Sequence, residues 1–355
     1  MTIKELAEEL QVSPAAISLA LNGKPGVSDA VRQRIIDKAK EYNYSPSRSS
    51  YNNKKHFTIR FIIYKKQLPD SVIRNISFYS LVLEGVEAAA KTQGYNILVS
   101  QLQEGPDEIL HLTELQNGAD AIIFFGTEFN EESPLCEELV RIDREICPVA
   151  VLDTRLHNTP LDCFTNDNFG GAYTAVEYLL AAGHRRIGHF TSSMRSVRNF
   201  DERSAGVASA IAACPGAELI SVPMRFSTKE AHDAVCEWAA DQPAGTLPTA
   251  FFADSDILAF GAIQAFSHLG LKVPDDISVL GYDDMPECEL FLPALSTIHV
   301  AKRTMGREAL YLIDRRIHER QNTAADAALW HPPLNITIKT MLIERSSVLP
   351  LHTDL

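Results

Sequence analysis

The chain has 355 residues, of which 45% are hydrophobic and 22% are charged, and its formal net charge is −13. This length exceeds the roughly 250–300 residues at which a single core stops growing, so we predict two or three folding units. The sequence has no run of about 18 apolar residues and no apolar leader at its N-terminus, which excludes a membrane span and a secretory signal. The protein is therefore expected to be cytoplasmic, without a membrane partner.

The six cysteines are scattered, and the smallest separation is the 11 positions between Cys136 and Cys147. This spacing fits neither a zinc motif nor a redox motif, and it is typical of reduced thiols in a cytosolic protein. We therefore predict no metal site and no cofactor.

Basic residues gather near the N-terminus, although the whole chain is acidic. Between Tyr42 and Pro69 there is no Asp or Glu, but there are six Lys or Arg residues. Such asymmetry indicates one end that meets phosphate and a body that does not, with a solvated basic linker as the alternative.

The first 44 residues predict three short helices. Thr2 opens a capping-box pattern with Glu5, Ser13 is placed to cap a second helix that begins at Pro14, and Ser28 is placed to cap a third. Only Gln11-Val12 remains for the first turn, which favours a helix-turn-helix over a generic three-helix bundle.

From Thr58 onward, apolar runs alternate with amphipathic segments, which predicts an α/β body with two doubly wound parallel sheets. In such sheets a ligand binds at the carboxyl ends of the strands, here in a cleft between two lobes. The predicted strands are 58–64, 96–101, 121–125, 148–152, 186–190, 250–253 and 277–281. The predicted helices include 81–93, 172–182, 202–212, 257–269 and 302–317.

Several motifs occur together and in order: TIKELAEELQVSPAAIS, YNYSP, GHRRI, ERSAG and VPDDISVLGYDD. With these, the chain resembles the lactose-repressor and galactose-repressor (LacI/GalR) family over nearly its whole length. The resemblance implies a helix-turn-helix headpiece, a hinge, and a two-lobed body like that of periplasmic binding proteins. The expected domains are a headpiece at 1–46, a hinge at 47–57, a body at 58–345 and a short tail at 346–355. The expected N-lobe covers about 58–160 and 293–322, and the expected C-lobe covers about 161–292 and 323–345.

The resemblance also implies which residues meet DNA. Short polar side chains near helix starts hold phosphates, where free N–H groups and the helix dipole favour an anion, and simple capping is the alternative for the serines and Thr2. Pro14, Ala15 and Leu19 match base-reading positions, although Ala and Leu offer no bidentate hydrogen bond to guanine. The complete expected DNA-binding set is Thr2, Ser13, Pro14, Ala15, Ala16, Ser18, Leu19, Asn22, Ser28, Tyr44, Arg48, Asn53, Lys54 and Lys55.

The hinge departs from the family pattern. Ser50 and Asn53 stand where the family usually carries Ala and Leu, and Asn is a poor helix former that cannot act as an apolar wedge. Asn53 can still donate in a minor groove and Tyr51 can insert instead, so folding of the hinge into a helix is left open.

The resemblance implies an effector site lined from both lobes. Asp283 matches a carboxylate that accepts ligand hydroxyls, Arg203 matches a donor to the same ligand, and flat aromatic side chains would face a sugar ring. Asp256 is also expected to cap the helix that begins near Ile257, and core packing is the alternative for Phe78 and Phe226. The expected effector-binding set is Phe78, Tyr79, Arg203, Phe226, Asp256 and Asp283.

The predicted function is a homodimeric transcriptional repressor that binds double-stranded operator DNA and is controlled by a small carbohydrate-like effector. The alternatives are an activator, a protein with non-specific DNA binding, and a sugar-binding protein without a regulatory role. An enzyme is not expected, since the sequence lacks the dinucleotide, P-loop, nucleophile-elbow and H-E-x-x-H motifs.

Overall fold

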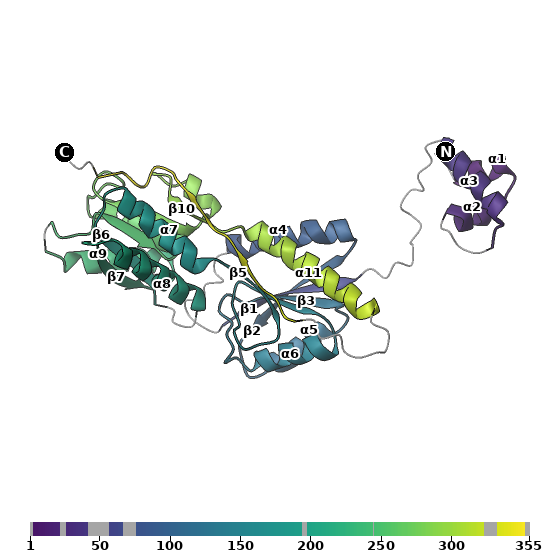
Figure 1. The fold of residues 1–355 in the computed structure, drawn as a ribbon, viewed down its shortest axis with the longest axis horizontal. Helices are drawn as coiled ribbons and strands as arrows, with labels where there is room; N and C mark the ends of the chain where they lie inside the picture. The colour runs from purple at the N-terminus through teal and green to yellow at the C-terminus, as the bar shows by residue number, and fades with distance from the viewer. Residues whose placement is uncertain are drawn as a thin grey trace. The chain divides into compact units, whose positions relative to one another are not determined.

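The computed structural model describes residues 3–21, 26–41, 57–66, 76–193, 197–243, 245–322 and 332–351 (Figure 1). The chain divides into two compact units, residues 1–56 and residues 57–355. We call the first unit the headpiece and the second unit the body. Among the described helices, none has both the length and the apolar character needed to cross a bilayer.

The described headpiece consists of α1 (Ile3–Leu10), α2 (Pro14–Leu21) and α3 (Asp29–Glu41). Apolar side chains at helical spacing, including Leu6, Ile17 and Ile35, form a small buried core. The Ser13 hydroxyl accepts a hydrogen bond from the Ala16 amide at 3.1 Å, so the predicted cap of the second helix is confirmed.

The body contains two six-stranded sheets (Figure 1). The first sheet has the order β11-β5-β4-β3-β1-β2, and all its strand pairs are parallel. Its strands are β1 (Thr58–Lys65), β2 (Asn96–Gln103), β3 (Ala121–Phe125), β4 (Val149–Leu152), β5 (Asp162–Asn166) and β11 (Asn335–Ile338).

The second sheet has the order β12-β10-β9-β8-β6-β7, in which only the edge strand β12 is antiparallel to its neighbour. Its strands are β6 (Arg186–Ser192), β7 (Glu218–Met224), β8 (Ala250–Ala253), β9 (Ser278–Asp283), β10 (Ser296–His299) and β12 (Met341–Ile343). Two parallel-dominated sheets with helices confirm the predicted α/β fold class.

Helices cover both faces of each sheet, which is why the central strands are continuous apolar runs. In β1, Phe61 packs toward α4 (Ile76–Gln93) and α11 (Lys302–Asn322), whereas Ile62 packs on the opposite face toward α5 (Glu108–Gln116) and α6 (Leu135–Glu145). In β8, Phe252 faces α7 (Asn168–Ala181) and α8 (Arg198–Ala213), and Phe251 faces α9 (Thr228–Ala240) and α10 (Asp256–His268). A short 3-10 turn, η2 (Pro286–Glu289), follows β9. Each sheet with its helices forms one lobe, here called the first and second lobe.

The sheet memberships correct the lobe boundaries expected from the sequence. Strand β5 and strand β11 pair in the first sheet, although both were assigned to the C-lobe, and β10 pairs in the second sheet, although it was assigned to the N-lobe. The chain therefore passes between the lobes after β5, after β10 and after β11. These three strands were missed as elements because they are short and carry polar residues.

Candidate functional site

The start of α2 presents the candidate DNA-reading surface of the headpiece. Pro14 and Ala15 are exposed, Ala16 is half-buried, and Leu19 is half-buried beside Gly26. Arg32 Nη1 donates to the Leu19 and Ala20 carbonyls at 3.3 and 3.2 Å, which satisfies the last carbonyls of α2 and fixes α3 against it. The expected contacts Thr2, Asn22, Tyr44, Arg48, Asn53, Lys54 and Lys55, the hinge positions Ser50 and Tyr51, and the Ser18 side chain lie outside the described residues.

Ser28 precedes α3, and its carbonyl accepts the Arg32 amide at 2.9 Å, as the residue before a helix does. Its side chain is exposed, as is that of Ser13 at the start of α2. Both serines therefore offer polar groups to solvent at a helix N-terminus.

A cavity in the body lies between the two lobes, at the carboxyl ends of the strands. Five of the six expected effector residues line it, and Asp256 does not. The complete lining is Phe78, Tyr79, Phe125, Thr127, Asp153, Val197, Asn199, Phe200, Arg203, Phe226 and Asp283.

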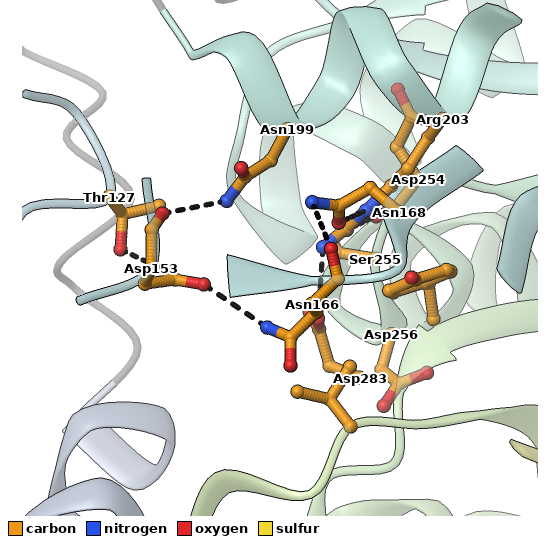
Figure 2. Close-up of polar contacts among 12 residues, drawn as sticks. Thr127, Asp153, Asn166, Asn168, Asn199, Arg203, Asp254, Ser255, Asp256 and Asp283 are labelled. Atoms are coloured by element: carbon orange, nitrogen blue, oxygen red, sulfur yellow. Dashed lines mark hydrogen bonds and ion pairs between the residues drawn. The ribbon is translucent and has the colours of Figure 1, made fainter. Parts of the chain in front are cut away.

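Arg203 of α8 is the charged centre of this cavity, and only 4% of the residue is exposed. Its Nε donates to Asn168 Oδ1 at 3.0 Å, its Nη2 lies 3.4 Å from Asp283 Oδ1, and its Nη1 donates to the Asp254 carbonyl (Figure 2). The guanidinium also lies over the Tyr282 ring, with its central carbon 3.7 Å from the ring centroid. The planar fork is thus held in one orientation.

Opposite charges balance this buried centre. Burial lowers the pKa of Arg203, but the surrounding acidic groups, Asp283 first and then Tyr282, Asp254 and Asp153, together outweigh burial and raise it. Burial raises the pKa of Asp283, while Arg203 and Lys302 oppose that shift. Lys302 Nζ in turn donates to the carbonyls of Asp283 and Val300. A ligand with hydroxyl groups would therefore meet both a fixed donor and a fixed acceptor.

Asp153, which follows β4, supplies a second polar cluster on the first lobe. Its carboxylate accepts from Thr127 Oγ1 at 2.6 Å and from Asn166 Nδ2 at 3.3 Å, and its carbonyl accepts from Asn199 Nδ2 at 3.0 Å (Figure 2). Because Asn199 belongs to α8 of the second lobe, this last hydrogen bond joins the lobes directly across the cavity.

The backbone at the cavity is strained. Among the described residues other than glycine, φ is positive at Gln11, Asp153, Asp283 and Asp284, with values of 63° at Asp153 and 112° at Asp283. A positive φ is costly for a residue with a Cβ, and such strain clusters at functional sites. The strain supports this cavity as the candidate site of the body.

Asp256 has a different place from the one expected. The N-cap of α10 is Ser255, whose hydroxyl accepts from the Leu258 amide at 3.4 Å, so the prediction that Asp256 caps this helix is wrong. The buried Asp256 carboxylate instead accepts from Thr297 Oγ1 at 2.6 Å and from the Met285 amide at 2.8 Å. Asp256 therefore holds the segment that follows β9 against β10, and it does not line the cavity.

The cavity is narrow, with a volume of about 30 Å³. A single water molecule needs about 10–15 Å³ on this measure, so a sugar-sized molecule enters only if the walls move apart. The Asn199–Asp153 hydrogen bond and the bond from Ser77 Oγ to Glu287 Oε1 at 3.3 Å connect the lobes and would break on opening.

The stability of the body should depend on the ionisation of Asp153. Burial raises the pKa of Asp153 from 3.8 to about 7, so between about pH 4 and pH 7 the folded protein holds a proton that the unfolded chain has lost. The protonated Asp153 carboxyl therefore adds to the free energy of unfolding below about pH 4. This added free energy is lost as the pH rises to 7, at a rate of up to about 1.4 kcal/mol per pH unit. Urea unfolding at several pH values, compared with Asp153→Asn, measures it. Asn tolerates a positive φ, so the variant isolates the charge. Parallel pH profiles for the two proteins would contradict the expectation.

The sequence analysis did not identify six of the lining residues. Four of these six could have been found from their positions, either directly after a predicted strand or on the same helix face as Arg203. Thr127 and Asp153 follow the predicted strands β3 and β4, where the carboxyl ends of parallel strands meet. Asn199 and Phe200 precede Arg203 by one turn on the same helix face. Phe125 and Val197 carry no polar signal.

Comparisons with known proteins agree with this architecture. Residues 2–47 match the family described as bacterial regulatory proteins, lacI family, and residues 176–348 match the periplasmic binding protein-like domain. The HTH-type transcriptional repressor PurR of Mannheimia succiniciproducens is 28% identical over 342 residues, which cover 94% of this chain and 97% of that protein.

Two solved structures share the fold. The transcriptional regulator CelR–cellobiose complex has a TM-score of 0.67 at 22% identity, over 98% of this chain and 99% of that one. The lac repressor dimer bound to operator and the anti-inducer ONPF has a TM-score of 0.64 at 22% identity, with the same two coverages. Residues 2–47 therefore carry a lacI-family helix-turn-helix, residues 176–348 carry a periplasmic binding protein-like domain, and the chain is similar over nearly its whole length to a repressor of this kind.

Proposed function

We propose that the protein is a homodimeric transcriptional repressor that binds double-stranded operator DNA through its headpiece and a sugar or sugar derivative in the body cavity. The observation that carries the effector part is the buried Arg203–Asp283 pair in a cavity walled by aromatic rings. A fixed donor and acceptor suit vicinal hydroxyls, and the rings of Phe78 and Phe226 suit the C–H faces of a sugar.

Control by the effector requires two arrangements of the lobes, one with the narrow cavity described above and one in which the cavity walls have moved apart. A ligand shifts a conformational equilibrium only by its difference in affinity for the two states. A sugar that fills the widened cavity breaks or replaces the Asn199–Asp153 contact, so it favours one lobe arrangement over the other. We propose that this arrangement releases the operator.

The DNA-binding part of the proposal depends on the exposed start of α2. Ser13 and the adjacent residues Pro14 and Ala15 would enter the major groove, with the helix N-terminus against a phosphate. Two headpieces on a two-fold dimer would match a palindromic site, since one headpiece makes few contacts. The similarity to a PurR repressor and to a lac repressor dimer bound to operator supports this assignment.

The test uses the full chain in two stages. The preferred duplex is first selected from random sequences, and light scattering measures the mass of the complex, which should hold two chains. Fluorescence anisotropy then records release of that duplex by a panel of monosaccharides, disaccharides and nucleobases. A sugar is expected to release DNA, whereas release by a nucleobase alone would overturn the carbohydrate part.

Asp283→Asn should lose the effector response and keep operator binding, because the headpiece is a separate compact unit. An unpaired buried ligand group costs about 1–3 kcal/mol, so effector affinity should fall roughly 10- to 100-fold. The exposed Asp241→Asn is the matched control and should respond like the wild type. Wild-type effector affinity in Asp283→Asn would show that the effector binds elsewhere, and tighter DNA binding with effector would show a corepressor.

A further inference from the structure

Three potential metal ligands meet on the second lobe, away from the cavity. His232 and Cys236 lie one turn apart on α9, and His268 lies at the end of α10. Residues at i and i+4 share one face of a helix, so His232 and Cys236 point the same way. Within the part of the chain that the structure describes, this is the one cluster of three such side chains.

Close packing of α9 and α10 creates the cluster. A Cβ at Gly261 would lie 2.5 Å from the Thr228 carbonyl oxygen and 2.6 Å from the Ala231 Cβ, so only glycine allows this approach. His268 follows Gly261 by two helical turns and therefore lies on the same face of α10. The rings of His232 and His268 are nearly parallel, with centroids 5.5 Å apart.

The distances between the candidate ligand atoms fit a tetrahedral metal ion. His232 Nε2 lies 3.8 Å from Cys236 Sγ and 3.4 Å from His268 Nδ1, and all three ligand atoms lie within 4.8 Å of one another. Tetrahedral zinc with ordinary Zn–S and Zn–N bonds requires about 3.6 Å between sulfur and nitrogen and about 3.4 Å between two nitrogens. Two separations already match, and a small rotation of the exposed His268 would complete the third.

A carboxylate orients the central histidine. His232 Nδ1 lies 2.9 Å from Asp233 Oδ1, so Nδ1 carries the hydrogen and Nε2 keeps its lone pair toward the cluster. Metal-binding histidines commonly donate their second ring nitrogen to a carboxylate in this way. This contact is a second observation, independent of the three ligand distances, that points to a metal.

We propose that His232, Cys236 and His268 bind one Zn²⁺ ion, with a water molecule in the fourth position. A thiolate with two imidazoles selects a borderline or soft cation over Mg²⁺ or Ca²⁺. Binding forms Zn–S and Zn–N bonds and releases the Cys236 thiol proton to solvent. The ion links α9 to α10, and α10 begins at Asp256 behind the cavity, so metal binding stabilises the second lobe.

The test uses full-length protein without an affinity tag, treated with a chelator and dialysed. CoCl₂ is added, and a thiolate-to-cobalt charge-transfer band in the near ultraviolet reports coordination by sulfur. Calorimetric titration with ZnCl₂ should give one ion per chain. Cys236→Ser should abolish the cobalt band, and Asp233→Asn should weaken zinc about 10- to 100-fold, as a lost orienting partner does.

Cys214→Ser is the matched control, because its thiol is half-buried on the same lobe but outside the cluster. It should bind cobalt and zinc like the wild type. A band that persists in Cys236→Ser would overturn the proposal. So would zinc affinity that is unchanged in the triple variant His232→Gln, Cys236→Ser, His268→Gln, with circular dichroism establishing that each variant is folded.

Discussion

Arg203→Ala is expected to lower the free energy of unfolding of the body by about 3–5 kcal/mol. The guanidinium is buried, and it donates to Asn168, to the Asp254 carbonyl and to Asp283. Its removal leaves the Asp283 carboxylate buried without its partner from α8, and a buried charge that loses its partner is far costlier than an exposed one. Urea unfolding of the full chain, monitored by circular dichroism, measures the change.

A matched variant at a surface arginine shows whether the loss of stability in Arg203→Ala comes from the burial of the side chain or only from the loss of its charge. Arg315 is 53% exposed at its side chain and lies 3.8 Å from Glu319, so Arg315→Ala should change stability by less than about 1 kcal/mol. In an Asp283→Asn background, Arg203→Ala should cost less than it does alone, because no orphaned charge remains. Equal costs in the two backgrounds would show that the Arg203–Asp283 pair does not determine the effect.

Gly306→Ala is expected to destabilise the first lobe by about 3 kcal/mol or more, since overpacking at a rigid contact has no easy relief. A Cβ at Gly306 would lie 2.0 Å from the Val82 carbonyl oxygen, and a Cβ at Gly85 would lie 2.0 Å from the Arg303 carbonyl oxygen. Helices α4 and α11 must therefore separate to accept any side chain at either glycine. Thermal and urea unfolding measure the loss.

Gly105 provides the comparison for Gly306. Its φ is not positive and no atom lies within 4 Å of a Cβ built there, so Gly105→Ala should be neutral or slightly stabilising. Gly306→Ala should also weaken the effector response, because α4 carries Phe78 and Tyr79 at the cavity wall. A free energy of unfolding equal to that of the wild type in Gly306→Ala would show that α4 and α11 can accommodate a Cβ at this contact.

Local chemistry explains what the sequence predicted well. Ser13 followed by Pro14 marked the start of α2. Burial of both faces of β1 and β8 produced the continuous apolar runs that marked those strands. Arg203 and Asp283 were found through the family resemblance and lie together in one cavity.

Features set by tertiary contacts could not be predicted in the same way. Ser255 and Asp256 are both good N-cap residues, and only the buried partners Thr297 and Met285 decide that Asp256 turns inward. The cysteine spacing could not reveal that His232, Cys236 and His268 come together, because His268 belongs to a helix that packs on α9 only after folding. Edge strands such as β11 are short and half-polar, so their pattern resembles that of a loop.

The three passages of the chain between the lobes have a consequence for synthesis on the ribosome. The first sheet needs β11, and its α4 face needs α11, so residues 302–338 must leave the ribosome before the first lobe is complete. Until then the edge of β5 lacks its strand partner, and an unpaired edge is a template for association with other chains. The second lobe likewise waits for β12. The nascent chain therefore completes both lobes almost together, once β11 and β12 have left the ribosome, instead of one after the other.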